Sequence, residues 1–402
     1  MALVYGAEML AGFLRNLRRL ARASSHALLL VVALAAAVAP GQSVCAADLI
    51  KTDAEKALLN ASRVGLATGS PTGAYAAMGA DLATLLDDHK GLGMRVVVQL
   101  GRGSLGNVDD LLNLALVDFA LVQGDVLESF RSDPAKYAEL KRKMRFVTQL
   151  HKEQVHLLAR NDIRQAKELN GLAVSVGAPG GGSLITAHNI FGRLGITPVY
   201  VETSPQQAMP DLLAGKIDAI LFVVGKPTST FQAIRADDVL LKKLHFVPLG
   251  GPEFTDYVVT QLVHDDYPNL IDQDVSVQSL AVPSVLAVFN WEPKAGRYGP
   301  VKKFIERFFE NANLLDAAGF RRDKWCEVDL AGDVPGWQRS PIAASWLALH
   351  PQQAGPICGR KSDDTCEAKF LEAMKRAGFD VSQMARPVRD SNFANWRKTN
   401  FC

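Results

Sequence analysis

The sequence predicts an α/β protein with two lobes joined by a double hinge. Its 402 residues suffice for two or three domains, and 48% hydrophobic with 21% charged residues is the composition of an ordinary globular protein. Between residues 63 and 224, an alternation of short apolar runs with amphipathic stretches occurs twice. Such alternation is typical of a mainly parallel sheet covered by helices, whose ligands bind beyond the carboxyl ends of the strands.

Each predicted lobe contains three strands separated by two helices. In the first lobe, the pattern predicts strand 63–67, helix 73–86, strand 94–100, helix 104–114 and strand 118–122. In the second lobe, it predicts strand 172–176, helix 182–194, strand 198–201, helix 205–213 and strand 217–224.

Two extended segments explain why we expect a double hinge. Residues 155–160 lead from the first unit into the second, and residues 279–289 return, before a helix at 301–315. We therefore assign residues 60–152 and 250–318 to lobe 1 and residues 153–249 to lobe 2. Closure around a ligand is the motion that such a hinge permits.

The first 47 residues have the order of a secretory signal peptide. Four arginines between Arg15 and Arg22 precede an apolar run over 27–39, and small residues follow at 45–47. The run is shorter than the roughly 20 residues that cross a bilayer. We expect cleavage near Ala47 and a soluble periplasmic protein, with the Sec and twin-arginine routes both open. Removing four arginines and one glutamate leaves 40 basic and 41 acidic residues, a net charge of −1, so we expect no nucleic-acid partner.

Four cysteines remain after cleavage, and all lie in the last quarter of the chain. Cys358 and Cys366 are eight residues apart across a turn-forming segment, so we predict a disulfide between them. Cys326 and Cys402 then pair by elimination. We expect residues 319–402 to form a disulfide-stapled C-terminal extension remote from the ligand cleft. The spacing of the cysteines does not indicate a metal site.

Glycine-rich loops follow the first strand of each lobe, at 67–75 and 177–183. Glycine lets a ligand approach the backbone closely, and the helix that follows begins with free N–H groups and a positive dipole end. This combination binds carboxylate or phosphate. An ordinary capped turn is the alternative for either loop alone, but their repetition predicts a shared site between the lobes.

Other motifs do not predict catalysis or a cofactor. The spacing Gly101-x-Gly103-x-x-Gly106 matches a dinucleotide fingerprint but lacks a suitably placed ribose-binding acid, so we expect no nucleotide cofactor. Ser183 lacks the second glycine of a nucleophile elbow. His151 and His156 would lie on opposite faces of a strand, so we expect no metal site and no enzymatic activity.

Five segments in the same order carry a resemblance to a known family: VGLATGSPTGAY (64–75), GRGSLGN (101–107), DFALVQGDV (118–126), LAVSVGAPGGGS (172–183) and KIDAILFVVGKPT (216–228). Over about residues 60–310 the chain resembles the TAXI family of extracytoplasmic solute receptors of tripartite (TRAP) transporters. The resemblance implies a type II periplasmic-binding-protein fold, a small carboxylate ligand such as glutamate, and delivery to a TRAP membrane permease. Departures from the family pattern at Ala76, Gly106 and Lys226 predict a ligand different from the usual one.

We predict that the ligand lies between the lobes. Lobe 1 would contribute Ser70, Thr72, Gly73, Tyr75, Ser104, Asn107, Gln123 and Asp125, and lobe 2 would contribute Gly182, Ser183 and Lys226. Arg102 and Lys226 are cations within or beside these loops, so we expect a small organic anion as ligand. We expect a monomer. A secreted hydrolase using Ser183 and a ligand-sensing periplasmic partner remain the alternatives.

Overall fold

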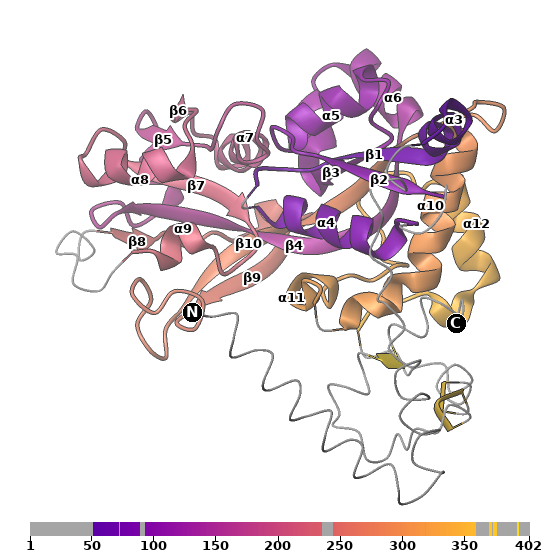
Figure 1. Ribbon diagram of the computed structural model, residues 1–402. Coiled ribbons are helices and arrows are strands. Elements are labelled where there is room, and N and C mark those ends of the chain that lie inside the picture. Colours follow the sequence, from indigo (N-terminus) through magenta and orange to yellow (C-terminus); the bar gives the residue numbers. More distant parts are fainter. Residues whose placement is uncertain are drawn as a thin grey trace, which may run out of the picture. The chain divides into compact units, whose positions relative to one another are not determined.

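The computed structural model describes residues 51–71, 73–88, 93–234, 244–317 and 319–358, together with 370–371, 373–375 and 392–393 (Figure 1). The chain divides into two units at residues 1–56 and 57–402, and the second unit contains the sheet described below. The predicted signal peptide, Thr72, Cys366 and Cys402 lie outside the described residues. Among the helices of the described part, none has the length and apolar character needed to span a membrane.

One mixed sheet of ten strands contains both predicted units, in the order β2-β1-β3-β10-β4-β7-β5-β6, with β8 on β4 and β9 on β10. Strands β1, β2 and β3 are parallel, and so are β5, β6 and β7. The strands are β1 (Arg63–Ala67), β2 (Arg95–Gln99), β3 (Phe119–Gln123), β4 (Met144–Arg160), β5 (Ala173–Ser175), β6 (Val199–Val201), β7 (Ala219–Val224), β8 (Leu244–Phe246), β9 (Val258–Val263) and β10 (Ser276–Phe289).

In each of the two lobes that the crossing strands join, helices connect the parallel strands. We call β1–β3 with α4, α5 and α10 lobe 1, and β5–β7 with α7, α8 and α9 lobe 2. The helices are α3 (Asp53–Ser62), α4 (Ala74–Leu86), α5 (Ser104–Asn113), α6 (Pro134–Lys143), α7 (Ser183–Leu194), α8 (Pro205–Leu213), α9 (Ser229–Gln232), α10 (Tyr298–Asn311), α11 (Arg322–Trp325) and α12 (Pro341–Leu349), with 3-10 turns that include η2 (Gly124–Phe130) and η6 (Ala312–Asp316).

The two long strands β4 and β10 connect the lobes. β10 pairs antiparallel with β3 of lobe 1, β4 pairs antiparallel with β7 of lobe 2, and the two strands pair with each other. The fold is therefore the predicted two-lobed α/β fold of type II, with two crossing strands. β4 begins at Met144, eleven residues before the start predicted for this crossing. The predicted start is too late because polar residues such as Thr148 and Glu153, although buried, interrupt the apolar pattern.

The C-terminal segment 319–358 is not a separate appendage, because it packs into the core of lobe 1. Trp325 is fully buried and belongs to the lobe 1 core with Phe304 and Phe308. Its indole Nε1 donates to Asp81 Oδ2 of α4 at 2.7 Å, and the backbone N–H of Ser340 donates to the carbonyl of Phe146 in β4 at 2.7 Å. The tryptophans of this segment complete the core of lobe 1.

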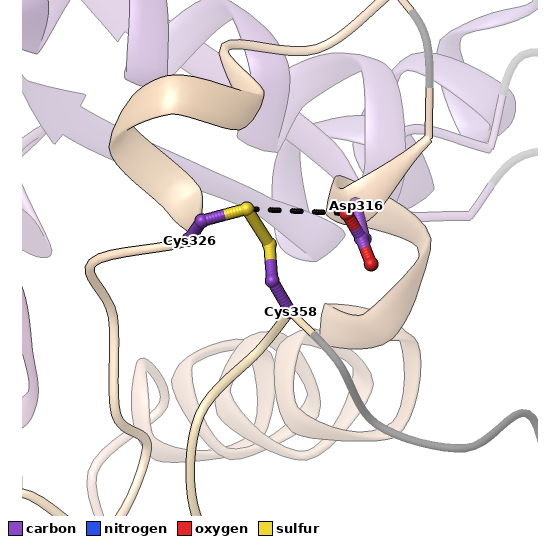
Figure 2. A group of neighbouring side chains, drawn as sticks. All are labelled: Asp316, Cys326 and Cys358. Carbon is purple, nitrogen blue, oxygen red and sulfur yellow. Dashed lines mark hydrogen bonds between the residues drawn. A yellow bond between two sulfur atoms is a disulfide. The ribbon is translucent and has the colours of Figure 1, made fainter.

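The disulfide joins Cys326 to Cys358 (Figure 2), so the predicted Cys358–Cys366 and Cys326–Cys402 pairs are wrong. The reason is a short antiparallel contact within the segment. Ile357 N–H donates to Val328 O at 2.9 Å and Leu330 N–H donates to Gly355 O at 3.0 Å, and this register brings the two cysteines together. The predicted pairing considers only how a turn could join cysteines that are close in sequence, so it misses packing between distant segments.

Asp316 lies beside this disulfide, with its Oδ1 3.9 Å from Cys326 Sγ (Figure 2). Three potential metal ligands therefore meet here. Cysteine binds a metal ion as a thiolate, whereas the two cysteine sulfurs here are bonded to each other. The oxidised cluster is consequently a covalent staple and not a metal site.

Replacing both cysteines, as Cys326→Ser with Cys358→Ser, should lower the free energy of unfolding. The cysteines are 32 residues apart, and closing a loop of that length is worth about 3–4 kcal/mol in the chain-entropy model. Urea denaturation of the wild type and the double variant measures the difference. Non-reducing peptide mapping is the direct check: a free thiol at Cys358 in exported protein would contradict the pairing.

Candidate functional site

A cavity of about 530 Å³ lies between the two lobes, where the carboxyl ends of the parallel strands meet. Hydroxyl groups and glycine backbone dominate its lining, with an apolar wall over Phe222–Val224. Lobe 1 contributes Ser70, Gly73, Tyr75, Gly101, Arg102, Gly103, Ser104 and Gln123; β4 contributes Glu153; lobe 2 contributes Gly177, Ala178, Pro179, Gly181, Gly182, Ser183, Ser204, Gln206, Phe222, Val223, Val224, Thr228, Ser229 and Thr230.

The glycine-rich loop 177–183 of lobe 2 contacts the start of α5 in lobe 1 beside the cavity. The carbonyl oxygen of Gly180 in lobe 2 accepts hydrogen bonds from the backbone N–H groups of Leu105 and Gly106 at the start of α5 in lobe 1, both at 3.1 Å. Gly103 has φ +105° and a Cβ there would lie 3.0 Å from Gly181 Cα, so this approach requires glycine. The lobes are therefore closed on each other, and two N–H groups of α5 are already occupied.

Two other helices begin at the cavity without a side-chain cap. α4 starts after Gly73 and α7 starts after Gly182. Both N-cap residues are glycines, so neither has a side chain that could cap the helix. The first N–H groups of a helix have no partner within the helix. Because α4 belongs to lobe 1 and α7 to lobe 2, both lobes offer N–H donors and a positive dipole end to an oxygen-rich ligand.

Tyr75 and Glu153 form a buried hydrogen-bonded pair in the cavity wall. The Tyr75 hydroxyl donates to Glu153 Oε2 at 2.7 Å, and the two side chains are 8% and 6% exposed. Burial raises the pKa of Glu153 to about 8, against the opposing effect of the Tyr75 hydrogen bond. Burial and the neighbouring Glu153 also raise the pKa of Tyr75. At neutral pH the Glu153 carboxyl is consequently protonated and can donate as well as accept.

Gln123 and two serines are oriented by backbone contacts around the same space. Ser104 Oγ accepts from Gln123 N–H at 2.9 Å, and Ser183 Oγ accepts from Val223 N–H at 3.0 Å. Gln123 is 2% exposed and its Oε1 has no hydrogen-bond partner in the described structure. A Cβ on Gly182 would lie 1.5 Å from this oxygen. This unpartnered oxygen is therefore buried against the residue that precedes α7.

The geometry gives no support to Ser183 as a nucleophile. Its hydroxyl is held by Val223 N–H, and the two buried histidines of the described structure have other partners. His151 Nδ1 lies 3.0 Å from Ser284 Oγ, and His156 Nε2 lies 2.7 Å from the Tyr267 hydroxyl. A nucleophilic serine needs a base within hydrogen-bond reach.

Three predicted site residues and one predicted cation have other roles. Asn107 Nδ2 donates to the carbonyls of Thr68 and Leu121 at 2.6 and 2.7 Å, so it connects β1 with β3 behind the cavity. Lys226 Nζ is paired with Asp266 at 2.7 Å, and Arg102, at the rim with 60% of its side chain exposed, pairs with acidic residues of α5.

Asp125, the third of these residues, connects the lobes. Its Oδ2 accepts from Thr186 Oγ1 of α7 at 2.8 Å and from the Tyr257 hydroxyl at 3.2 Å. Burial raises the pKa of Asp125 to about 6, while the two hydrogen bonds lower it. Asp125 therefore contributes to the contact between the lobes and does not line the cavity.

The cavity brings together Ser70, Gly73, Tyr75, Ser104, Gln123, Gly182 and Ser183 of the predicted set. Sequence reasoning missed Glu153, which sits on a crossing strand assumed to begin two residues later. It also missed Lys324, a lysine that is 6% exposed in the C-terminal segment. Glu153 lies in the polar stretch 151–154, so apolar patterning offered no signal for it.

Glu153→Gln should change how stability depends on pH. In the wild type, Glu153 keeps its proton up to about pH 8 when folded but loses it near pH 4.5 when unfolded, so raising pH over this window favours unfolding. We expect the stability of the variant relative to wild type to rise by about 1.4 kcal/mol per pH unit there, because glutamine does not titrate. Urea denaturation between pH 5 and 8 tests this, with exposed Glu202→Gln as control; parallel curves for wild type and Glu153→Gln would contradict it.

The model of the NMT1-like family matches residues 66–319, more than half of the chain. Among solved structures, the chain is similar to the periplasmic binding protein BugD, with 15% identity, 79% of this chain and 97% of that chain covered, and a TM-score of 0.40. It is also similar to the alkanesulfonate-binding protein SsuA from Xanthomonas axonopodis pv. citri, bound to MOPS, with 14% identity, 79% and 93% coverage and a TM-score of 0.39.

A TRAP periplasmic solute-binding protein from Anaerococcus prevotii with bound D-glucuronate matches at 14% identity, with 61% of this chain and 77% of that chain covered and a TM-score of 0.36. The match to the family model covers both lobes and both crossing strands. The chain belongs to the NMT1-like family.

Proposed function

We propose that the protein is an extracytoplasmic solute receptor that binds a small carboxylate between its lobes. The single observation that carries the proposal is the cavity into which α4 and α7, from opposite lobes, both open with uncapped N-termini. Backbone N–H groups and helix dipoles favour an anionic oxygen. Both cations that suggested an anion have acidic partners, so the N–H groups replace them as the basis for anion binding.

The other lining groups restrict the ligand further. Phe222 and its neighbours offer an apolar wall, while the Glu153 carboxyl offers a polar contact. A ligand with one carboxylate, a short carbon body and a second polar group fits this lining. Glutamate-like compounds and other organic acids belong to this class.

We further propose that the receptor is a TAXI-type member of its family, exported to the periplasm and delivering its ligand to a TRAP permease. Support comes from the five segments that resemble TAXI receptors, since all five contribute residues to the cavity lining: 64–75, 101–107, 118–126, 172–183 and 216–228. Membership of the NMT1-like family is compatible with this assignment. Mass spectrometry of ligand carried through purification identifies the bound compound, and a hydrophobic or purely cationic compound would contradict the proposal.

Gly182→Ala should weaken carboxylate binding by about 10- to 100-fold. The new methyl group meets Gln123 Oε1 and Ser104 Oγ and enters the space between the α7 N-terminus and lobe 1. Isothermal titration with a panel of amino acids, dicarboxylates and their amides measures the loss.

Gly192→Ala is the matched control on the same helix, because a Cβ there meets nothing within 4 Å. We expect this control to bind as wild type does. Equal affinities for the two alanine variants would place the ligand elsewhere, and turnover of any compound in the panel would favour an enzyme.

A further inference from the structure

Residues 321–327, which we call the C-terminal strap, are anchored on lobe 1. The backbone N–H of Arg321 and the indole Nε1 of Trp325 both donate to Asp81 Oδ2, at 2.9 and 2.7 Å. Asp81 lies on α4, the helix whose N-terminus lines the cavity. Cys326 then attaches the strap covalently to residue 358. The strap therefore has a buried polar anchor and a covalent one on the lobe 1 side.

The same segment reaches lobe 2 through one buried lysine. Lys324 Nζ donates to the backbone carbonyl of Lys226 at 3.0 Å, and only 8% of the Lys324 side chain is exposed. Lys226 lies in the loop between Val224 and Thr228, both of which line the cavity. A Cβ on the adjacent Gly225 would be 3.3 Å from Lys324 Nζ, so the loop and the lysine are in close contact.

A third contact fixes the strap on the crossing strand β4. Glu327 Oε1 lies 3.3 Å from Lys324 Nζ, and its Oε2 accepts from the backbone N–H of Lys152 at 2.9 Å. Lys152 immediately precedes Glu153 of the cavity wall. Figure 1 shows α11, which carries Lys324, outside the sheet of both lobes. The lysine thus has one acceptor on lobe 2 and one beside the crossing.

We propose that the C-terminal strap ties lobe 1 to lobe 2 beside the crossing strands and holds the receptor toward its closed arrangement. Opening the lobes separates the Lys226 carbonyl from an ammonium that stays fixed to lobe 1 by Trp325 and the disulfide. A buried ammonium that loses an acceptor is destabilised. Closure is thereby favoured even without ligand, and Lys324 acts as a positioning residue for the lobe 2 wall.

Hydrogen–deuterium exchange of the ligand-free full chain tests the strap. The amides of Leu105 and Gly106 are the reporters, because they donate to Gly180 across the lobes and lose protection when the lobes open. We expect Lys324→Met to speed exchange of peptides containing them at least fivefold. Lys324→Arg keeps the charge and donors and should restore protection, and Lys302→Met, at an exposed position of α10, should leave it unchanged.

Peptides from the fully buried strand β3 distinguish strap loss from general destabilisation. If Lys324→Met leaves the α5 reporters unchanged, or speeds β3 as much as α5, the proposal is overturned. Glu327→Gln is the second variant, expected to give about a twofold effect, and it decides the matter should Lys324→Met fail to fold. Because the experiment uses no ligand, its result can be interpreted even if the protein does not bind a carboxylate.

Discussion

The antiparallel pairing of β4 with β10 is the constraint on which the rest of the structure depends. These strands connect lobe 1 through β3 and lobe 2 through β7, and their pairing runs from Met144–Phe289 at one end to Gln154–Ala281 at the other. Because they fix where the carboxyl ends of both parallel sets meet, they also fix the cavity. A buried carboxyl on β4, Glu153, lies where the lobes join, so the same strand crosses between the lobes and lines the cavity.

Closure in this structure is made largely by backbone groups. Gly180 accepts from two amides of α5, and Asp125 adds a side-chain bridge to α7. This approach needs glycine at Gly103 and uses Gly180 of the loop 177–183, so glycine also allows the lobes to meet. The N-terminus of α5 is occupied by the opposite lobe, whereas α4 and α7, which follow the two glycine-rich loops 67–75 and 177–183, begin without a side-chain cap.

Local sequence pattern predicted the strands and helices of both lobes to within a few residues, and it placed most of the lining loops. It did so because apolar periodicity and glycine position are local properties. The pattern failed where long-range packing decides. The Cys326–Cys358 bond follows from pairing of 328–330 with 355–357, and Lys324 reaches the site from a segment 98 residues beyond Lys226 in sequence. Glu153 was missed because it lies in the polar stretch 151–154, which local pattern predicts to be exposed although Glu153 is buried.

The net charge offered by the cavity depends on how each charged side chain around it is neutralised. Lys226 and Arg102 have acidic partners, Lys324 has Glu327, and burial keeps Glu153 protonated at neutral pH. No side chain that lines the interior of the described cavity therefore supplies a free positive charge. Under the proposed function, N–H groups from both lobes would bind the anion, so its affinity would depend on closure of the lobes. A segment that favours closure, as we propose for the C-terminal strap, would then raise affinity without contacting the ligand.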